Sequence, residues 1–324
     1  MDKLKVITEP VREEIEMFNR TFGEALQGHS RDFQAMIDFI SGLNGKRIRP
    51  LLTLLSSKLC GETNSKSIDF ALIIELLHTT TLIHDDVVDS TLERRSKPSV
   101  NAKYDNRVAV LLGDYILALA ITHAVKVRNM DIMAIIARVA KHLADGELTQ
   151  LISSRELILN EDRYFDVIRN KTAVLFAACG EMGAIAAGAD AETRETMRLI
   201  TENLGLCFQL RDDIFDYYDK GEIGKPTGND IREGKITLPL LYALKAAPEE
   251  VFREMYAIIE RKDFLGDNIN RLTDFAKENG GIEYTRGKML EIRETILTLL
   301  AGFPYSNAKR AMEELVDYII ERGK

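Results

Sequence analysis

The chain contains a stretch of 127 residues without proline, between Pro98 and Pro226, although seven prolines occur in all. Such a stretch is hard to reconcile with a turn-rich all-β protein, whose tight turns draw on proline and glycine. Proline is also the residue that most strongly interrupts a helix, so its absence over this length favours long helices. We therefore expect an all-α fold.

Apolar residues recur at helical spacing in segments spread along the chain. These segments are residues 11–26, 68–88, 132–151, 191–215 and 292–300. The dense apolar run at residues 108–121 would also suit a buried strand, but its length and its neighbours favour a buried helix. Clusters of Gly, Pro, Asn, Asp and Ser separate the segments without resembling a domain linker. We predict a single domain over residues 1–324.

The composition limits the partners that the chain can bind. A net charge of -8 argues against non-specific binding to nucleic acid or to an anionic membrane surface, because both need a basic face. No stretch reaches the roughly 18 uninterrupted apolar residues of a membrane span. The charged N-terminal residues, broken by Pro10, do not resemble a signal or transit peptide, so we expect a cytoplasmic location. The three cysteines lack the paired spacing of a zinc site, and we expect buried thiols.

Two acidic motifs end apolar helical segments far apart in the sequence. The first runs from His84 to Asp89 and the second from Gln209 to Asp216. Each contains two aspartates four residues apart, which a helix places one turn apart on the same face. Like charges so placed repel each other, and a bound cation reverses the sign of that interaction. One such motif is also typical of a solvated helix face, but two copies in apolar segments favour a metal site.

Magnesium is the cation that such motifs would suit, because it is typically held by one or two carboxylates together with substrate phosphate oxygens. Phosphate binding also needs cations, and short basic clusters lie near both motifs. Arginine offers phosphate a planar fork of donors, whereas lysine offers a mobile point charge. The clusters are Gly45 to Pro50, Arg94-Arg95, Lys171-Thr172 and Gly224-Lys225.

These residues resemble the trans-isoprenyl diphosphate synthases, or polyprenyl synthetases, and the match runs in order from about residue 44 to residue 239. Besides the clusters above, it includes Gly113-Asp114, Gly146-Glu147 with Gln150, and Phe208-Gln209. The resemblance implies an isoprenoid synthase fold, in which packed helices surround a deep central apolar cavity. It also implies a homodimer, with the two acidic motifs facing each other at the cavity mouth.

The resemblance further implies a role for each matching residue. The ligands of about three Mg²⁺ ions per active site would be Asp85, Asp89 and Asp212, with Asp86, Asp213 and Asp216 in support. The allylic diphosphate (farnesyl or geranylgeranyl) would be held through these ions and by Arg94, Lys171 and Lys225. Isopentenyl diphosphate would lie on Lys46, Arg49, His78 and Arg95. The hydroxyl of Thr172, the amide of Gln209 and the carbonyl of Lys171 would stabilise an allylic cation.

The sequence departs from the family pattern at Ser96, where glycine commonly follows the paired arginines, and this puts the loop geometry of the isopentenyl site in doubt. Every charged position of both motifs is intact. The second motif and the basic cluster argue against a terpene cyclase, and the intact motifs argue against a non-catalytic partner subunit. A di-iron bundle would need two Glu-x-x-His pairs, and only Glu75 with His78 has that spacing.

Product length in this family depends on bulky residues that form a floor below the first motif. Short-chain relatives tend to carry an aromatic ring at the positions of Thr80 and Thr81, so nothing large blocks that level here. Leu77, Ile73 and Ile74 lie deeper and are either a floor or plain helix packing. The segment from residue 74 to residue 89 resembles the long-chain subgroup that makes quinone side chains. We expect a product of about C30 to C50, with geranylgeranyl or farnesyl diphosphate as the alternative.

Overall fold

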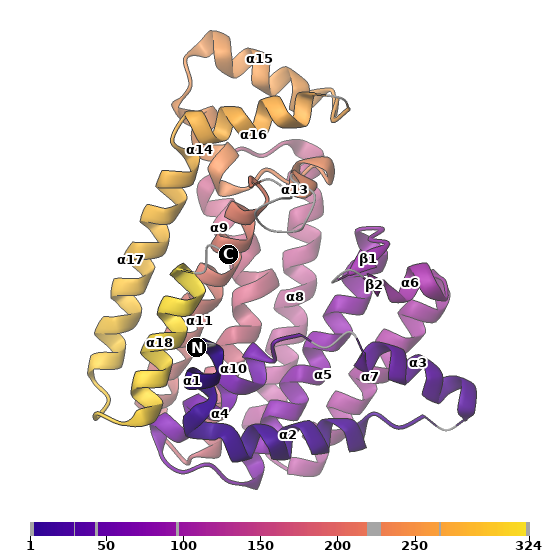
Figure 1. Cartoon of the computed structure of the whole chain (residues 1–324), viewed down its shortest axis with the longest axis vertical. Helices are drawn as coiled ribbons and strands as arrows, with labels where there is room; N and C mark the ends of the chain where they lie inside the picture. The colour runs from indigo at the N-terminus through magenta and orange to yellow at the C-terminus, as the bar shows by residue number, and fades with distance from the viewer. Residues whose placement is uncertain are drawn as a thin grey trace. The chain divides into compact units, whose positions relative to one another are not determined.

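The computed structural model describes residues 3–28, 30–42, 45–94, 97–218, 228–265 and 267–321, and these are almost entirely helical (Figure 1). The chain divides into two compact units, each assembled from segments that are distant in the sequence. Unit 1 comprises Met1–Arg138, Leu175–Thr201 and Phe303–Glu314, and unit 2 comprises Val139–Val174, Glu202–Gly302 and Leu315–Lys324. The predicted all-α class is confirmed. The single domain and the deep central cavity stay predictions.

Unit 1 contains the N-terminal helices and a short hairpin. Its elements are α1 (Lys3–Thr8), the 3₁₀ turn η1 (Glu9–Val11), α2 (Arg12–Ala25), α3 (Arg31–Ser41), α4 (Ile48–Cys60), α5 (Ser65–Val88), β1 (Glu93–Arg94), β2 (Lys97–Pro98), α6 (Val100–Lys103) and α7 (Asn106–Val127). The two strands pair antiparallel, with Arg94 opposite Lys97. Four helices contribute residues to both units, namely α8 (Met130–Glu156), α10 (Val174–Ala186), α11 (Ala191–Phe215) and α18 (Asn307–Glu321).

Helices α5 and α7 pack side by side in unit 1 (Figure 1). Helix α5 is apolar nearly all round and is buried over most of its length, as expected of a core helix. The hydroxyl of Thr80 on α5 donates to the carbonyl oxygen of Gly113 on α7 at 3.3 Å. A Cβ atom at Gly113 would lie 2.2 Å from the imidazole of His84, so only glycine permits this close approach. The ambiguous run at residues 108–121 is thus a helix.

Helix α7 is buried on one side and exposes apolar side chains on the other. Val110, Leu111, Ile121 and Val125 are 41%, 68%, 42% and 58% exposed. Among the described residues, α7 is the one helix long and apolar enough to cross a membrane by length and composition, although its inner side packs on α5. The helix therefore presents an apolar stripe that its own unit does not cover.

Unit 2 is built from the remaining helices. Its elements are α9 (Glu161–Ile168), the π-helical turn η2 (Arg169–Ala173), α13 (Asn229–Arg232), α14 (Leu238–Ala246), α15 (Glu249–Glu260), α16 (Asn268–Glu278) and α17 (Gly281–Ala301). Helix α14 packs against α16 and α17 (Figure 1). The rings of Tyr242 and Tyr284 stack at 4.1 Å, and the Tyr284 hydroxyl donates to Glu161 at the start of α9. These contacts fix α9, which leads into the π turn.

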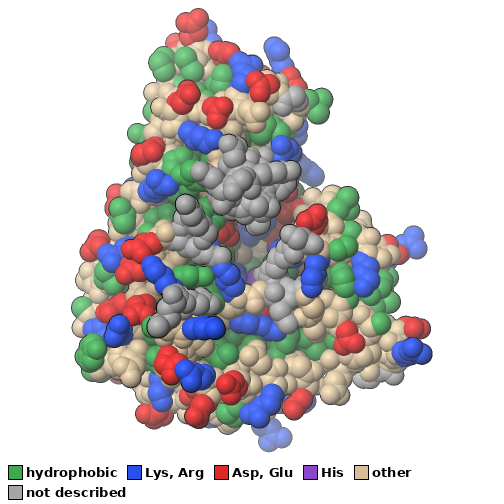
Figure 2. Space-filling view, viewed as in Figure 1, with side chains coloured by type: hydrophobic (Ala, Val, Ile, Leu, Met, Phe, Trp, Pro, Cys, Tyr) green, Lys and Arg blue, Asp and Glu red, His purple; other side chains and the backbone are tan. Residues whose placement is uncertain are grey.

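The surface and the cysteines agree with the composition. Basic and acidic side chains are interspersed on the face shown in Figure 2, with no broad basic area. Cys179 and Cys207 are buried and Cys60 is half-buried. Burial raises the pKa of each of the three thiols to about 12. The prediction of buried thiols is confirmed for Cys179 and Cys207, whereas Cys60 is only half-buried.

Candidate active site

The first acidic motif forms the last turn of α5, with Asp89 as the capping residue. Asp85 and Asp89 are half-buried, whereas Asp86 is only 2% exposed. The helix dipole places partial negative charge at this end, so each carboxylate there is disfavoured by about 0.3–1 kcal/mol. The motif therefore keeps two partly accessible carboxylates where local structure disfavours negative charge. A bound cation would relieve that cost.

Asp86 binds an arginine that follows the motif. The Nε atom of Arg94 in β1 donates to both carboxylate oxygens of Asp86, at 2.9 and 3.1 Å, and its Nη2 atom lies 2.8 Å from Oδ1. Charge-assisted forks of this kind are among the strongest protein hydrogen bonds. The sequence assigned Arg94 to the allylic diphosphate, and the structure engages its guanidinium with Asp86. Arg95 and Ser96 lie outside the described residues.

Two of the residues expected to bind isopentenyl diphosphate, Arg49 and His78, come together in unit 1. The Nη1 atom of Arg49 lies 2.9 Å from Nε2 of His78. Its neighbour Arg47 contacts Glu75 at 3.3 Å and lies over the ring of Phe22 at 4.1 Å. Lys46 is exposed. A small cavity of about 40 Å³ is lined by residues that include His78, Asp86 and Arg94. It therefore brings a residue expected to bind isopentenyl diphosphate together with residues expected to bind the allylic diphosphate and its metal ions.

The second acidic motif forms the last turn of α11. Like the first motif, it contains an accessible aspartate next to a buried one. Asp212 has a side chain that is 45% exposed, and its Oδ1 atom accepts from Arg211 at 2.9 Å. Asp213 is 3% exposed. The carboxylate of Asp216 accepts from the backbone amides of Asn229 and Asp230, both at 2.9 Å, which anchors the segment that begins at residue 228. Lys225 lies outside the described residues.

Lys171 and Thr172 lie on the π turn η2, between α9 and α10. Single π turns change the register of backbone hydrogen bonds and are frequent at functional sites. The ammonium of Lys171 contacts Glu147 at 2.6 Å and Gln150 at 2.9 Å, both on α8. Two side chains of α8 therefore fix the direction in which this lysine points.

A chain of hydrogen bonds connects the π turn to the second motif. The Thr172 hydroxyl donates to Oε1 of Gln209 at 2.7 Å, and Nε2 of Gln209 donates to Oδ1 of Asp213 at 2.7 Å. The buried Tyr164 hydroxyl donates to Oδ2 of Asp213 at 2.5 Å. Both oxygens of Asp213 thus accept hydrogen bonds, so its position is set by α9 and by its own helix.

Burial controls the protonation of this cluster. It raises the pKa of Asp213 to about 7, against the hydrogen bonds from Tyr164 and Gln209, which act in the opposite direction. Burial, with Asp213 and Asp216 nearby, holds the pKa of Asp230 well above its usual range. Burial also raises the pKa of Asp216. A nearby cation would favour the ionised forms.

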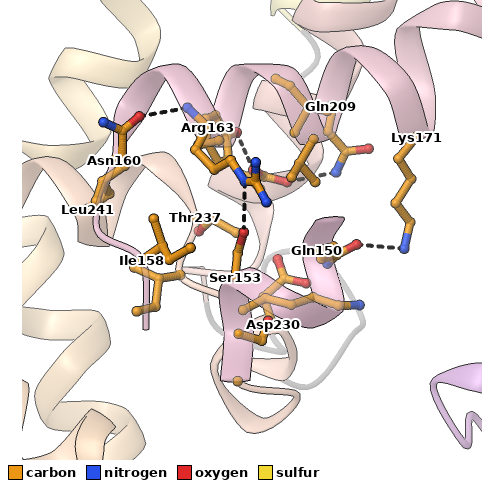
Figure 3. A pocket seen from close by; sticks show the side chains of 18 of the residues that line it. Gln150, Ser153, Ile158, Asn160, Arg163, Lys171, Gln209, Asp230, Thr237 and Leu241 are labelled. Carbon is orange, nitrogen blue, oxygen red and sulfur yellow. Dashed lines mark hydrogen bonds between the residues drawn. The ribbon is translucent and has the colours of Figure 1, made fainter. Parts of the chain in front are cut away.

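Tyr164, Gln209, Asp213 and Asp230 line a cavity of about 120 Å³ in unit 2 (Figure 3), and Asp216 does not. Its polar part includes Lys171, Thr172, Gln209 and Asp213, which the sequence assigned to the site. Its lining also includes residues that sequence reasoning missed: Tyr164, Arg163, Asp230 and Lys235. The pair Gly234-Lys235 repeats the Gly-Lys pattern of residues 224–225, a signal by which Lys235 could have been found.

A family model for the polyprenyl synthetases matches residues 30–272. The all-trans-nonaprenyl-diphosphate synthase (geranyl-diphosphate specific) of Rhodobacter capsulatus is 33% identical over 320 residues, which cover 98% of this chain and 97% of that protein. This chain belongs to the polyprenyl synthetase family. Its members transfer prenyl groups, so the chain is an enzyme of that class.

Solved structures agree with this assignment. A polyprenyl synthase of Caulobacter crescentus, complexed with calcium and isoprenyl diphosphate, has a TM-score of 0.92 and 33% identity, covering 99% of this chain and 98% of that one. A geranylgeranyl pyrophosphate synthase of Bacteroides thetaiotaomicron has a TM-score of 0.86 and 38% identity, covering 99% of this chain and 100% of that one. This polyprenyl synthetase thus has relatives named for different product lengths.

The donor set of this polyprenyl synthetase suits magnesium. Among the described residues, no three His, Cys, Asp or Glu side chains gather closely enough to enclose an ion. Mg²⁺ does not need such a cage, because it keeps several waters and takes one or two carboxylates with substrate phosphate oxygens. Within unit 1, Asp85 and Asp89 are half-buried carboxylates that fit this demand, and within unit 2 the partly exposed Asp212 does so.

The proposed chain-length residues differ in their surroundings. Thr80 is 5% exposed and bonded to α7, whereas Thr81 is half-buried and its hydroxyl donates to the carbonyl of His78 on its own helix. Leu77 and Ile74 are 3% and 0% exposed. None of the four lines either of the two cavities above. Their effect on product length stays a prediction.

Replacing Gly146 with alanine is expected to lower kcat by about 100-fold, the scale of a displaced catalytic group. A Cβ atom at this position would lie 2.8 Å from the backbone nitrogen of Lys171 and 3.1 Å from the carbonyl carbon of Asn170, so the π turn must move. Steady-state kinetics with saturating substrates measure the effect.

The matched control is Gly287→Ala on α17, where a Cβ atom meets nothing within 4 Å. This variant should keep full activity and gain up to about 1 kcal/mol of helix stability. Equal kcat values for the two variants would contradict the positioning of Lys171 by Gly146.

Proposed function

We propose that this chain condenses an allylic diphosphate with successive isopentenyl diphosphate units in trans, and releases a polyprenyl diphosphate of about C30 to C50. The observation that carries the proposal is the pair of acidic motifs. Each sets one or two partly accessible aspartates beside buried ones that are held by hydrogen bonds. The likeness to the Rhodobacter capsulatus nonaprenyl-diphosphate synthase over nearly the whole chain supports it.

We propose Mg²⁺ as the cofactor, about three ions per active site. Asp85, Asp89 and Asp212 would supply carboxylate ligands, and the buried aspartates of both motifs would support them. The calcium and isoprenyl diphosphate of the Caulobacter crescentus structure support a divalent ion as the partner of the diphosphate. Bound Mg²⁺ would act as a Lewis acid that stabilises the leaving diphosphate.

The cations of the chain would assist the first step. Lys171, held by Glu147 and Gln150, would direct its ammonium at the allylic diphosphate, and Lys235 lines the same cavity. The carbon-oxygen bond of the allylic substrate would then break, with the electron pair leaving on the diphosphate. Thr172, Gln209 and the Lys171 carbonyl present oxygen atoms that favour the resulting allylic cation.

Carbon-carbon bond formation would follow on the isopentenyl side. Lys46, Arg49 and His78 would hold the diphosphate of isopentenyl diphosphate, whose double bond attacks the allylic cation. Loss of a proton to the released diphosphate would then restore a double bond. These reaction steps balance in atoms, electrons and protons without a further base or an oxidant. The contribution of the protein is to hold cationic side chains in position for both diphosphates.

The test of this function is incubation of the purified chain with farnesyl diphosphate, labelled isopentenyl diphosphate and Mg²⁺, followed by sizing of the dephosphorylated products. A ladder that ends between about C30 and C50 supports the proposal. A stop at C20, the length that the name of the Bacteroides thetaiotaomicron relative suggests, would keep the chemistry and overturn the product length. If no labelled isopentenyl diphosphate is incorporated, and the sample with a chelator gives the same result, a cyclase or a non-catalytic partner subunit is favoured.

We further propose a cytoplasmic homodimer in which a second copy covers the exposed side of α7. The apolar side chains there are spaced along one stripe, and burial of such surface contributes about 25 cal/mol per Å². Asp114, whose side chain is 59% exposed, interrupts this stripe, but exposed apolar patches on soluble proteins commonly mark interaction sites. A second copy of the chain would cover it without any lipid.

Leu111→Glu is expected to convert the dimer into a monomer, because it places a charge at the most exposed apolar position of α7. Sedimentation velocity measures the change. Leu265→Glu is the matched control, since Leu265 is 80% exposed on unit 2 and should leave the dimer intact. A wild-type monomer, or a chain recovered with membranes, would overturn this part of the proposal.

A further inference from the structure

Arg211 is a buried arginine inside the second acidic motif, and the reaction proposed above does not use it. Its side chain is only 6% exposed. The guanidinium lies over the rings of Phe208 at 4.7 Å and Phe215 at 5.3 Å. A buried charge costs free energy unless it is paired and hydrogen-bonded. The hydrogen bonds and the ion pair of this side chain should therefore offset the cost of burying its charge.

Arg211 joins the motif to the end of the C-terminal helix. Its Nη2 atom donates to Oδ1 of Asp212 at 2.9 Å, and its Nη1 atom donates to the carbonyl oxygen of Ile319 at 3.3 Å. Ile319 lies in the last turn of α18, which ends at Glu321, so its carbonyl has no partner within the helix. A cation there also complements the negative end of the helix dipole. One planar guanidinium thus bridges α18 and Asp212.

This geometry leaves little freedom to the carboxylate. The two terminal nitrogen atoms of a guanidinium are fixed relative to each other, so anchoring one of them on Ile319 directs the other at Asp212. The flanking rings restrict the plane of the group. Lysine, with a single mobile ammonium, could not make both bonds in the same way. The Nε atom of Arg211 has no hydrogen-bond partner among the described residues, and the hydrogen bonds of the group to Ile319 and Asp212 run through Nη1 and Nη2.

We propose that Arg211 is a positioning residue that orients Asp212 for the metal, and that the last turn of α18 thereby sets the metal affinity of the second motif. The inference rests on the proposed function, because it takes Asp212 as a metal ligand. Hydrogen-bond partners that orient a metal ligand typically change metal affinity by 10- to 100-fold when they are removed. With a side chain that is only 6% exposed, Arg211 would act through Asp212 and not by contact with the substrate.

The test measures Mn²⁺ binding by electron paramagnetic resonance in the presence of inorganic diphosphate, in an Asp85→Ala background so that the second motif dominates the signal. Arg211→Met should raise the Kd for Mn²⁺ by about 10-fold or more. Arg211→Lys should do so too, because it keeps the charge and loses the bridge. Removal of residues 319–324 should act in the same direction, since it deletes the acceptor carbonyl.

Arg293→Met is the matched control. Arg293 donates to Asp317 at 2.8 Å, so it holds the same part of α18 without contacting Asp212. This variant should lower the thermal unfolding temperature and leave the Kd for Mn²⁺ within about twofold of the background. If Arg293→Met weakens Mn²⁺ binding as much as Arg211→Met, general packing explains the effect and the inference fails.

A further variant separates this inference from the proposed function. Asp212→Asn in the same background should weaken Mn²⁺ binding strongly. If it has no effect, the metal role of Asp212 is wrong and the proposed function is at fault. If it weakens binding and folded Arg211→Met or Arg211→Lys does not, the positioning role of Arg211 is wrong while the proposed function stands.

Discussion

Replacing Asp85 with alanine is expected to lower kcat by about 1,000-fold or more at saturating Mg²⁺, the scale seen when a group that stabilises developing charge is removed. Asp85 is half-buried in the last turn of α5, where a carboxylate is disfavoured by the helix dipole. Its removal should therefore change the free energy of unfolding far less than it changes the activation free energy of the reaction. Labelled isopentenyl diphosphate incorporation and thermal unfolding measure the two quantities.

The matched control for Asp85 is Asp131→Ala. The Asp131 side chain is 64% exposed at the start of α8 and is paired with Arg194. Losing an exposed ion pair costs up to about 1 kcal/mol of stability and should leave kcat unchanged. An Asp85→Ala enzyme that kept more than about a tenth of wild-type kcat would show that the first motif is not the metal site of this reaction.

Replacing Thr81 with phenylalanine is expected to shorten the product by several isoprene units. Thr81 is half-buried, and its hydroxyl donates to a carbonyl oxygen of its own helix. An aromatic ring can therefore be added there without breaking a hydrogen bond to α7. Thr80 is a poorer choice, because it is buried against Gly113 and overpacking there costs typically about 1–3 kcal/mol. Chromatographic sizing of the dephosphorylated products measures the change.

Thr79→Phe serves as the control for Thr81. Thr79 is also half-buried on α5 and donates to a carbonyl of its own helix, that of Glu75, but two positions along a helix turn it to another face. It lines the cavity near His78, so the variant should slow the reaction without shortening the product. Unchanged product length in Thr81→Phe would mean that the floor lies elsewhere.

The sequence predicted the helical class and both acidic motifs because these depend on local patterns. The scarcity of proline and the apolar periodicity can both be found along the chain without knowledge of tertiary contacts. The dense apolar run of α7 left strand and helix open, since periodicity cannot separate them when nearly every side chain is apolar. Its packing on α5 resolves the choice, and that packing joins residues far apart along the chain, as the hydrogen bond from Thr80 to the carbonyl oxygen of Gly113 shows.

Other features of the site depend on tertiary contacts and could not be predicted from local pattern. The π turn at Lys171 depends on side chains of α8 and on the close approach of Gly146. The division between accessible Asp212 and buried Asp213 reflects the surroundings of each, including the hydroxyl of Tyr164 from another helix. Lys235 lines the cavity of unit 2 only because the fold brings it there. Roles carried by Arg95 and Lys225 stay predictions, since both lie outside the described residues.

The pairing of each buried aspartate with its own donor has a consequence for evolution. Asp86 is matched to Arg94, and Asp213 is matched to Tyr164, so a lineage cannot lose one partner without stranding the other in a poorly hydrated place. Substitutions at these positions should therefore arise together among relatives. Asp85 and Asp212, which we propose as metal ligands, should change only when the chemistry itself is abandoned. An alignment of such proteins would thus separate drift in the scaffold from loss of the reaction.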